Sequence, residues 1–260
     1  MLLLAIAIVA SIAAIVFAAL FIQYRRRLYF EQGRDTGGTI RTVELDEFDD
    51  VFRQTDLGPT LEAEVRFVGS GRGVPGGTSD REAWILATLA KGRRTMFEFG
   101  TATGKTTYLL ARNSPDDARV HTITLPPDAL AQYDAGVSDS GLAERKAREE
   151  SVFTTFLYTG TDVEPKVEQL YGDSKALDAT PWAGRCDLIF VDGSHAYSYV
   201  KSDTEKALRM IAPGGVILWH DYQPLRRSVR DVCRALDEVA GTVPLVRLSR
   251  TTLVAYRAPE

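Results

Sequence analysis

The N-terminal end of this chain is an apolar run with no charged residue from Met1 to Ile22. Folded as an α-helix, the run would be about 33 Å long, which matches a bilayer hydrocarbon core of about 30 Å. A cleaved signal peptide is the alternative, but it would carry basic residues before a shorter apolar stretch, whereas Arg25 to Arg27 follow this run. Positive charge prefers the cytoplasmic side of a membrane. We therefore predict that residues 1–24 form a single-pass transmembrane anchor and that the folded remainder is cytoplasmic.

The composition of the whole chain is that of a folded protein. Of 260 residues, 45% are hydrophobic and 25% are charged, which excludes a disordered or low-complexity chain. The 31 basic side chains are outnumbered by 35 acidic ones, giving a net charge of −4. Nucleic-acid binding normally requires a basic face, so we predict no nucleic-acid partner. Cys186 and Cys233 lie in apolar contexts and are expected to be packed thiols.

Between the anchor and the folded domain, residues 25–78 are expected to form a juxtamembrane linker and the approach to the domain. The glycine-rich stretch 69–77 cannot hold regular structure, because glycine is conformationally free and Pro75 lacks an amide donor. Ser79 followed by Glu82 is a capping box, in which the two side chains satisfy free backbone amides at the start of a helix. The pattern predicts one domain over residues 79–260.

Short apolar runs alternate with helical patterns through this domain. Runs with little polar alternation are typical of strands covered on both faces, and strands alternating with helices predict a parallel sheet with helices on both sides. Two β-rich pieces close the chain and are near enough to form a hairpin. The predicted fold class is therefore α/β, a doubly wound sheet with an antiparallel terminal hairpin. The expected strands are Thr95–Phe99, Val120–Thr124, Val167–Tyr171, Asp187–Val191, Val216–Trp219, Pro244–Leu248 and Thr252–Tyr256, and the expected helices include Thr106–Arg112, Tyr197–Met210 and Arg226–Val239.

A glycine turn follows the first of these strands. From Glu98 to Thr106 the chain reads Glu-Phe-Gly-Thr-Ala-Thr-Gly-Lys-Thr. Dinucleotide sites need a middle glycine where Ala102 is nearest, and a P-loop needs its first glycine at the position of Phe99. A carboxylate before the turn repels phosphate and suits a cation, so Glu98 indicates S-adenosylmethionine, which carries a sulfonium and an amino group. A plain strand-to-helix turn with a buried, paired Glu98 is the alternative.

Four ordered motifs give the chain a resemblance to a known family. They are Glu98–Gly104, Leu170–Ser174, Asp187–His195 and Ala212–Tyr222, of which the Pro-Gly-Gly turn in the last is the most specific. Over most of the predicted domain, the chain resembles the class I S-adenosylmethionine-dependent methyltransferases, in particular the small-molecule O-methyltransferase-like branch of the methyltransferase family 24 type. The resemblance implies a Rossmann-like sheet, S-adenosylmethionine as the cofactor, and a terminal hairpin that adds an antiparallel strand.

The resemblance also implies which residues bind the donor. The family usually ends its second strand with an acid that binds the ribose hydroxyls, but Thr124 stands at that position. Either Asp128 reaches the ribose instead, or the hold on the ribose is weaker. The family places an acid near the adenine, which here is Asp173. The implied cofactor-binding residues are Glu98, Phe99, Gly100, Thr101, Ala102, Thr103, Gly104, Thr124, Asp173, Ser174 and Asp192.

Polar residues follow the fourth and fifth strands. Asp192 and His195 leave the fourth strand, and Asp221 closes the fifth. Neighbouring parallel strands lie about 4.8 Å apart and ligands bind beyond their carboxyl ends, so these side chains are expected to converge on one site. A histidine of near-neutral pKa suits removal of a proton from an acceptor hydroxyl. We predict His195 as the catalytic base and Asp192 as the group that orients it, with local capping of the next helix as the alternative.

In methyltransferases resembling catechol O-methyltransferase, acids at these two strand ends hold Mg²⁺. The resemblance therefore implies Mg²⁺ as a candidate second cofactor, bound by Asp192 and Asp221. Tyr222 stands where the family has an amide ligand, and it is a poorer ligand for this ion.

These features together predict a membrane-anchored methyltransferase that acts on oxygen of a small-molecule, sugar or lipid-linked acceptor. Two alternatives remain: a P-loop-like NTPase, which Gly104–Thr106 suggests, and a non-catalytic S-adenosylmethionine-binding scaffold, which Thr124 suggests. Arginines between Arg226 and Arg230 could meet an anionic acceptor, although a solvated basic helix turn is the simpler interpretation. Residues 137–165 are expected to form a charged insertion or a lid.

Overall fold

The computed structural model describes residues 2–31, 37–56, 58–66, 77–142, 145, 147 and 151–260. Within these residues an eight-stranded sheet has the order β1-β9-β10-β8-β7-β4-β5-β6, and a separate hairpin pairs β2 with β3. Strands β4 to β8 run parallel to one another, whereas β10 is antiparallel to both β8 and β9. The strands are β1 (Thr42–Val43), β2 (Gln54–Thr55), β3 (Gly58–Pro59), β4 (Thr95–Phe99), β5 (Arg119–Thr124), β6 (Val167–Tyr171), β7 (Cys186–Val191), β8 (Ile211–Trp219), β9 (Val246–Leu248) and β10 (Val254–Arg257).

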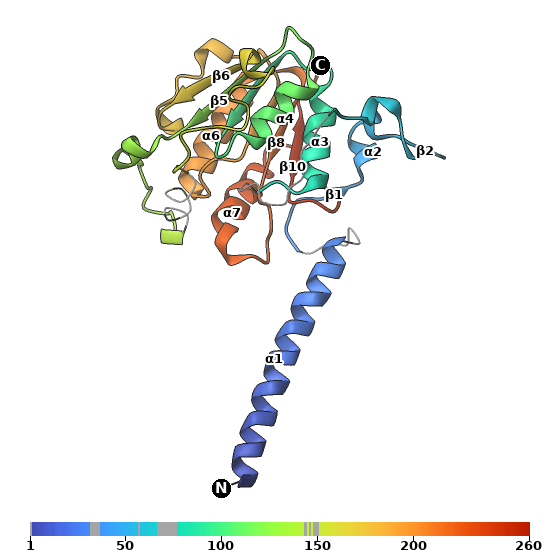
Figure 1. Cartoon of the computed structure of the whole chain (residues 1–260), viewed down its shortest axis with the longest axis vertical. Coiled ribbons are helices and arrows are strands. Elements are labelled where there is room, and N and C mark those ends of the chain that lie inside the picture. Colours follow the sequence, from blue (N-terminus) through green and yellow to red (C-terminus); the bar gives the residue numbers. More distant parts are fainter. Residues whose placement is uncertain are drawn as a thin grey trace.

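Helices cover both faces of this sheet (Figure 1). The capping box expected at the start of the domain is present, because the Glu82 amide donates to Ser79 Oγ at 3.3 Å and the Ser79 amide donates to Glu82 Oε2 at 2.8 Å. The helices are α1 (Leu2–Glu31), α2 (Leu45–Phe48), α3 (Asp80–Ala90), α4 (Lys105–Asn113), α6 (Tyr197–Met210) and α7 (Arg230–Val239), with short 3₁₀ turns at Asp50–Phe52, Leu61–Ala63, Pro127–Gln132, Glu164–Lys166, Ser174–Ala176, Thr180–Trp182 and Arg227–Val229.

The α/β, doubly wound, Rossmann-like fold and its antiparallel terminal hairpin are confirmed. Strands β4 and β6 have the predicted bounds, and β5 and β7 each begin one residue earlier than expected. Strand β8 is longer than expected because it begins at Ile211 and includes the Pro-Gly-Gly turn, where Gly214 has φ +69°. The helix expected from Arg226 begins only at Arg230, since the intervening residues form a 3₁₀ turn.

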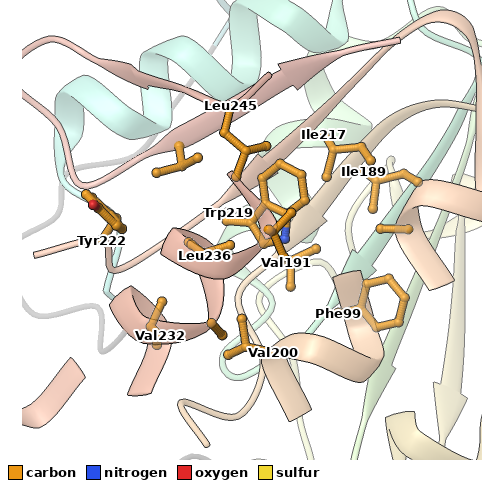
Figure 2. Close-up of a cluster of buried hydrophobic side chains, with 14 of the residues drawn as sticks. Phe99, Ile189, Val191, Val200, Ile217, Trp219, Tyr222, Val232, Leu236 and Leu245 are labelled. Carbon is orange, nitrogen blue, oxygen red and sulfur yellow. The ribbon is translucent and has the colours of Figure 1, made fainter. Parts of the chain in front are cut away.

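The sheet is buried on both faces because alternate side chains of its central strands point to opposite sides. In β7, Ile189 contacts one core cluster and its neighbour Phe190 contacts the other. The first cluster includes side chains of α6 and α7 and the indole of Trp219 (Figure 2). The Trp219 Nε1 donates to Thr204 Oγ1 at 2.9 Å. The second cluster lies against α3 and α4. Because both faces are covered, the carboxyl edge of the parallel strands is the natural place for a ligand.

Part of the segment before residue 79 packs on the domain. Val43 extends the sheet beside β9, and the fully buried Phe52 packs against Trp84 of α3 with ring centroids 5.2 Å apart. The division into 1–24, 25–78 and 79–260 stays a prediction. The glycine-rich residues 69–76, and several residues of the predicted lid over 137–165, lie outside the described residues.

Helix α1 projects away from the domain (Figure 1). Its stretch Ile6–Arg25 has a mean hydropathy of 2.6, and none of it is buried within the protein. Among the described residues it is the one helix long and apolar enough to cross a bilayer. A signal sequence meets the same criteria of length and composition, so a membrane span over residues 1–24 stays a prediction.

Candidate active site

The turn between β4 and α4 depends on backbone conformations that favour glycine. Gly100 has φ +97° and Gly104 has φ +75°, and Ala102 between them has φ +42°. A side chain at Gly100 would collide with the backbone of Asp192 at the end of β7. The Asp192 amide donates to the Phe99 carbonyl oxygen at 2.9 Å, so the turn and this strand end are held together. The result is a compact bend that exposes backbone groups rather than bulky side chains.

Glu98 lies beneath this turn and is almost fully buried. Its Oε2 accepts hydrogen bonds from the hydroxyls of Thr107 and Thr122, the second at 2.7 Å. Burial raises the pKa of Glu98 to about 8, because two neutral hydroxyls do not replace the water that a charged carboxylate loses. Glu98 is therefore mostly neutral at pH 7. The structure places it under the turn, and it is not among the described residues that line the cleft.

An open cleft of about 550 Å³ lies over the turn at the carboxyl ends of β4, β5, β6 and β7. Thr124 lines it from the end of β5, Asp173 from the end of β6, and Asp192 from the end of β7. The cleft thus lies where three strand ends meet the glycine turn. Of the predicted donor-binding residues, Gly100, Ala102, Thr124, Asp173, Ser174 and Asp192 line the cleft, whereas Glu98, Phe99, Thr101, Thr103 and Gly104 are outside the lining that the structure describes.

Two stacked tyrosines form one side of the cleft. The rings of Tyr133 and Tyr199 are nearly parallel, with an interplanar angle of 8° and centroids 4.7 Å apart. The Tyr199 hydroxyl donates to Asp173 Oδ2 at 2.8 Å, and the Tyr133 hydroxyl lies 2.9 Å from Ser194 Oγ. The stack offers an aromatic surface beside a carboxylate. No local pattern in the sequence marks Tyr133, which follows the 3₁₀ turn Pro127–Gln132 after β5.

A smaller hollow adjoins the cleft beyond the ends of β7 and β8. His195 and Asp221 both line it, and His195 Nε2 lies 2.9 Å from Asp221 Oδ2. Asp221 has φ +66°, a left-handed conformation that non-glycine residues seldom adopt. Asp192 lines both the hollow and the cleft. The structure brings the three residues together as the sequence predicts, but the carboxylate that contacts His195 is Asp221 and not Asp192.

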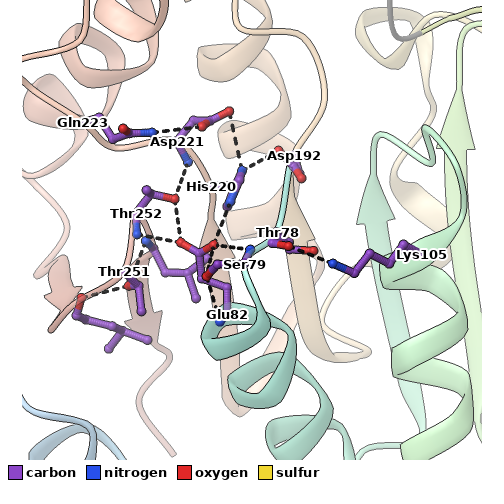
Figure 3. A network of polar contacts seen from close by, with 12 residues as sticks. Thr78, Ser79, Glu82, Lys105, Asp192, His220, Asp221, Gln223, Thr251 and Thr252 are labelled. Carbon is purple, nitrogen blue, oxygen red and sulfur yellow. Dashed lines mark hydrogen bonds and ion pairs between the residues drawn. The ribbon is translucent and has the colours of Figure 1, made fainter. Parts of the chain in front are cut away.

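His220, which follows β8, joins this hollow to helix α3 (Figure 3). Its Nδ1 lies 3.1 Å from Asp192 Oδ1 and 3.5 Å from Asp221 Oδ2, and its Nε2 lies 3.4 Å from Glu82 Oε2. Burial alone would lower the pKa of His220, but the charge of Asp192 and the hydrogen bonds to all three carboxylates raise that pKa well above its usual value. His220 is therefore an imidazolium enclosed by acids.

Glu82 is a member of this cluster that the sequence indicated only as a helix cap. Its Oε2 accepts hydrogen bonds from the amide and hydroxyl of Ser79, and its Oε1 accepts from the amide and hydroxyl of Thr252, at 2.7 to 2.8 Å. Burial alone would raise the pKa of Glu82, but these bonds and the contact with His220 lower it to about 2. Glu82 therefore stays ionised at neutral pH. Local patterns could not reveal this, because Glu82 and Thr252 are 170 positions apart in the chain.

Residues 97–222 match a family described as methyltransferase domain. The matched segment contains the glycine turn, the strand ends of the cleft, and the His195–Asp221 pair. This segment of the chain is a methyltransferase domain. No curated protein matches this methyltransferase.

Several solved structures are similar to the methyltransferase. The O-methyltransferase TomG from Streptomyces achromogenes, described as involved in tomaymycin synthesis and as a complex with S-adenosylmethionine, is 21% identical, with a TM-score of 0.45 over 70% of this chain and 82% of that chain. The Podospora anserina methyltransferase PaMTH1 is 20% identical, with a TM-score of 0.47 over 70% of this chain and 80% of that one. An O-methyltransferase from Bacillus cereus is 19% identical, with a TM-score of 0.44 over 68% and 81%.

The lysine that suggested a P-loop has a structural partner in the methyltransferase. Lys105 is buried, and its Nζ donates to the Thr78 carbonyl oxygen at 2.8 Å (Figure 3). A P-loop lysine instead reaches the phosphates of its nucleotide. The side chain of Lys105 therefore ties α4 to the segment before α3, and the NTPase alternative has no support.

Whether Mg²⁺ fits the hollow depends on the ligand atoms that its residues offer. Asp192, His195 and Asp221 each present one ligand atom, all within 4.8 Å of one another. Mg²⁺ prefers oxygen ligands, yet one of these three atoms is an imidazole nitrogen, and both carboxylates already contact the imidazolium of His220. Tyr222, at the position of the family's amide ligand, donates its hydroxyl to a carboxylate on α7 at 2.6 Å. This set of residues does not fit Mg²⁺.

Proposed function

We propose that this methyltransferase is a membrane-anchored O-methyltransferase that acts on a hydroxyl of a small-molecule, sugar or lipid-linked acceptor. The observation that carries the proposal is the position of Asp192, which lines the large cleft on one side and the hollow with His195 and Asp221 on the other. A donor in the cleft and a hydroxyl in the hollow would meet beside this carboxylate. Methyl transfer needs the two reactants held in line, and adjoining cavities supply that arrangement.

In the proposed reaction His195 is the catalytic base. The acceptor oxygen attacks the methyl carbon, the carbon–sulfur bond breaks, and its electron pair stays on sulfur to give S-adenosylhomocysteine. The hydroxyl proton passes to the His195 imidazole. Asp221, at 2.9 Å from His195 Nε2, orients the ring and stabilises the imidazolium that forms. This role replaces the one predicted for Asp192, whose carboxylate contacts His220.

Donor binding is assigned to the cleft. Gly100 and Ala102 leave room for close approach of the donor to the backbone of the turn. Asp173 and Ser174, beside the tyrosine stack, form the end of the cleft that suits an adenine ring. Thr124 supplies a neutral hydroxyl where an acid would bind the ribose more strongly. Mg²⁺ at Asp192 and Asp221 has no part in this proposal, because the residues do not suit it.

The anchoring part of the proposal depends on α1. A bilayer span at Ile6–Arg25 would leave the arginines from Arg25 onward at the cytoplasmic surface, where S-adenosylmethionine is made. It would also raise the concentration of the enzyme near acceptors that are themselves in the membrane. This supports a lipid-linked acceptor over a freely diffusing one.

The test uses the full-length protein in detergent, methyl-labelled S-adenosylmethionine and a lipid extract of membranes. We expect a labelled product from the wild type, and a loss of turnover of about 10²-fold or more for His195→Gln, with S-adenosylhomocysteine binding unchanged. His121→Gln is the matched control, because His121 lies within β5 and outside the cleft lining. Wild-type turnover by His195→Gln would overturn the assignment of the base. Donor binding without labelled product from any extract would instead support the scaffold alternative.

A further inference from the structure

Large apolar side chains are exposed on two loops near the start of α7. Leu225, on the loop after β8, is 53% exposed, Leu142 is 50% exposed, and Val137 is fully exposed. The two loops meet at the start of α7, where the amide of Ser140 donates to Asp231 Oδ2 at 2.8 Å. Apolar side chains that gather at one edge of a folded domain often mark an interaction surface.

Basic side chains flank this apolar group. Arg226, Arg227 and Arg230 follow Leu225 directly and are all exposed. Among the described residues, no carboxylate forms an ion pair with any of the three within 4.0 Å. Asp231 is buried and accepts an amide hydrogen bond, so the nearest acid in the sequence is used within the fold. Unpaired arginines beside exposed leucines are the combination that binds the interface of an anionic bilayer, at about 1 kcal/mol per basic residue.

The chain enters the domain against this same loop. Gly38 lies so close to Tyr222 and Pro224 that a side chain there would collide with both, and the Thr39 amide donates to the Tyr222 hydroxyl oxygen at 3.2 Å. Only residues 32–36 separate α1 from the described part of the domain, and a segment of that length spans at most about 20 Å. Figure 1 shows α7 at the end of the domain from which α1 projects. The tether therefore keeps the loop after β8 close to the end of α1.

We propose that Leu225, Arg226, Arg227 and Arg230, together with the exposed loop around Val137 and Leu142, form a docking surface for an anionic lipid bilayer. The inference rests on the anchoring by α1 proposed above. Docking at this edge turns the hollow with His195 and Asp221 toward the lipid headgroups. An acceptor hydroxyl on a lipid headgroup or a lipid-linked sugar could then reach the base without leaving the membrane.

The experiment uses the full-length protein in phosphatidylcholine vesicles with or without phosphatidylglycerol. A thiol-reactive, environment-sensitive fluorophore is attached at Leu225→Cys and, in a separate variant, at Ala183→Cys, an exposed position next to the amino end of β7. The native Cys186 and Cys233 are buried, so they do not compete for the label. We expect spin-labelled lipids to quench the label at position 225, by about twofold or more over position 183, and more strongly in anionic vesicles.

Charge variants separate docking from simple proximity. Arg226→Glu with Arg227→Glu should remove most of the added quenching in anionic vesicles. Arg185→Glu with Arg209→Glu is the matched control, because both arginines are exposed at the opposite edge of the sheet, and it should leave the quenching unchanged. Equal quenching at positions 225 and 183, or no effect of reversing Arg226 and Arg227, would overturn the proposal.

A third label position distinguishes an error in the docking proposal from an error in the anchoring proposal. A fluorophore at Ile15→Cys, in the middle of the apolar stretch of α1, should be quenched by lipids that are spin-labelled deep in the acyl chains. Quenching at position 15 without quenching at position 225 contradicts the docking surface alone. Absence of quenching at both positions contradicts the anchor and the docking surface together.

Discussion

The cleft assigned to the donor and the hollow assigned to the acceptor each have a buried glutamate nearby, and the pKa values of the two glutamates are shifted in opposite directions. On the donor side, Glu98 is surrounded by neutral threonine hydroxyls, and burial raises its pKa to about 8. On the acceptor side, Glu82 is as deeply buried, but two backbone amides and the imidazolium of His220 lower its pKa to about 2. Burial alone therefore does not set the charge of a carboxyl group in this protein. The partners decide, since hydroxyls stabilise an ionised carboxylate much less than amides and a cation do.

In the proposed function, this difference gives the donor side and the acceptor side different tasks. A donor side without an ionised group beneath its turn can accept the sulfonium and the carboxylate of S-adenosylmethionine without a strong preference for either sign. An acceptor side built on His220 and its three acids holds a fixed electrostatic field around His195. Such a preorganised field is where enzymes obtain much of their rate acceleration.

The largest effect should come from removing the central cation. His220→Gln leaves Glu82, Asp192 and Asp221 buried or half-buried without their shared positive partner. We expect the free energy of unfolding to fall by about 3–5 kcal/mol, measured by chemical denaturation of the full-length protein in detergent. His121→Gln is the control, because His121 contacts a single carboxylate, that of the exposed Glu168 at 2.8 Å, and otherwise packs against Phe97 and Trp182. Its loss should cost about 1 kcal/mol. Equal losses for the two variants would refute the special role of His220.

A smaller effect, visible as a change in pH dependence, should follow from Glu98→Gln. In the unfolded chain this carboxyl ionises near pH 4.5, whereas in the folded protein it stays protonated up to about pH 8. The unfolded state therefore binds fewer protons between these values, and the wild type should lose stability as the pH rises from 4.5 to 8. Glutamine keeps a neutral acceptor for Thr107 and Thr122, so this part of the pH dependence should vanish. Unfolding curves at pH 5, 7 and 8.5 check this; parallel pH profiles for the two proteins would contradict it.

An acid at the position of Thr124 should strengthen the binding of the donor. Thr124 lines the cleft at the end of β5, and aspartate there would accept charge-assisted hydrogen bonds from the ribose hydroxyls. We expect Thr124→Asp to lower the Kd for S-adenosylhomocysteine about tenfold, by about 1.4 kcal/mol, in isothermal titration calorimetry. Thr124→Asn, which lacks the charge, is the matched control and should gain less. Unchanged affinity in Thr124→Asp would place the ribose elsewhere in the cleft.

The smallest effect should come from metal removal. The residues of the hollow do not suit Mg²⁺, and the carboxylates already contact a cation of the protein itself. Initial rates with labelled donor and membrane lipid extract should be the same with a chelator as with added Mg²⁺. Loss of activity in the chelator, restored by Mg²⁺, would return Asp192 and Asp221 to the role of metal ligands.

The sequence predicted the parts of the molecule that depend on local patterns. The alternation of strands and helices predicted a parallel sheet, because strands that are buried on both faces are continuously apolar. The helix predicted over Tyr197–Met210 has the same bounds as α6. The convergence of Asp192, His195 and Asp221 could also be predicted, because it requires only that adjacent parallel strands end at one edge.

The rest depends on contacts between residues distant in the chain. The orientation of Glu98 could not be predicted, because it depends on Thr122 in the neighbouring strand offering a hydroxyl beneath the turn. The cluster around His220 draws on Glu82, which is 138 positions away. A capping box looks the same in the sequence whether or not its glutamate also pairs with a buried imidazolium.

The contact between Gly100 and the end of β7 has a consequence for how this enzyme can change over evolutionary time. The turn at Gly100 that would receive the donor contacts the strand end that carries Asp192, and there is no space for even a methyl group between them. A substitution that moves the turn must therefore be accompanied by one that moves the strand end. A change of acceptor is expected to arise through substitutions in the loops that carry Leu225 and Val137, which lie outside this contact. The contact between Gly100 and the end of β7 is expected to stay unchanged.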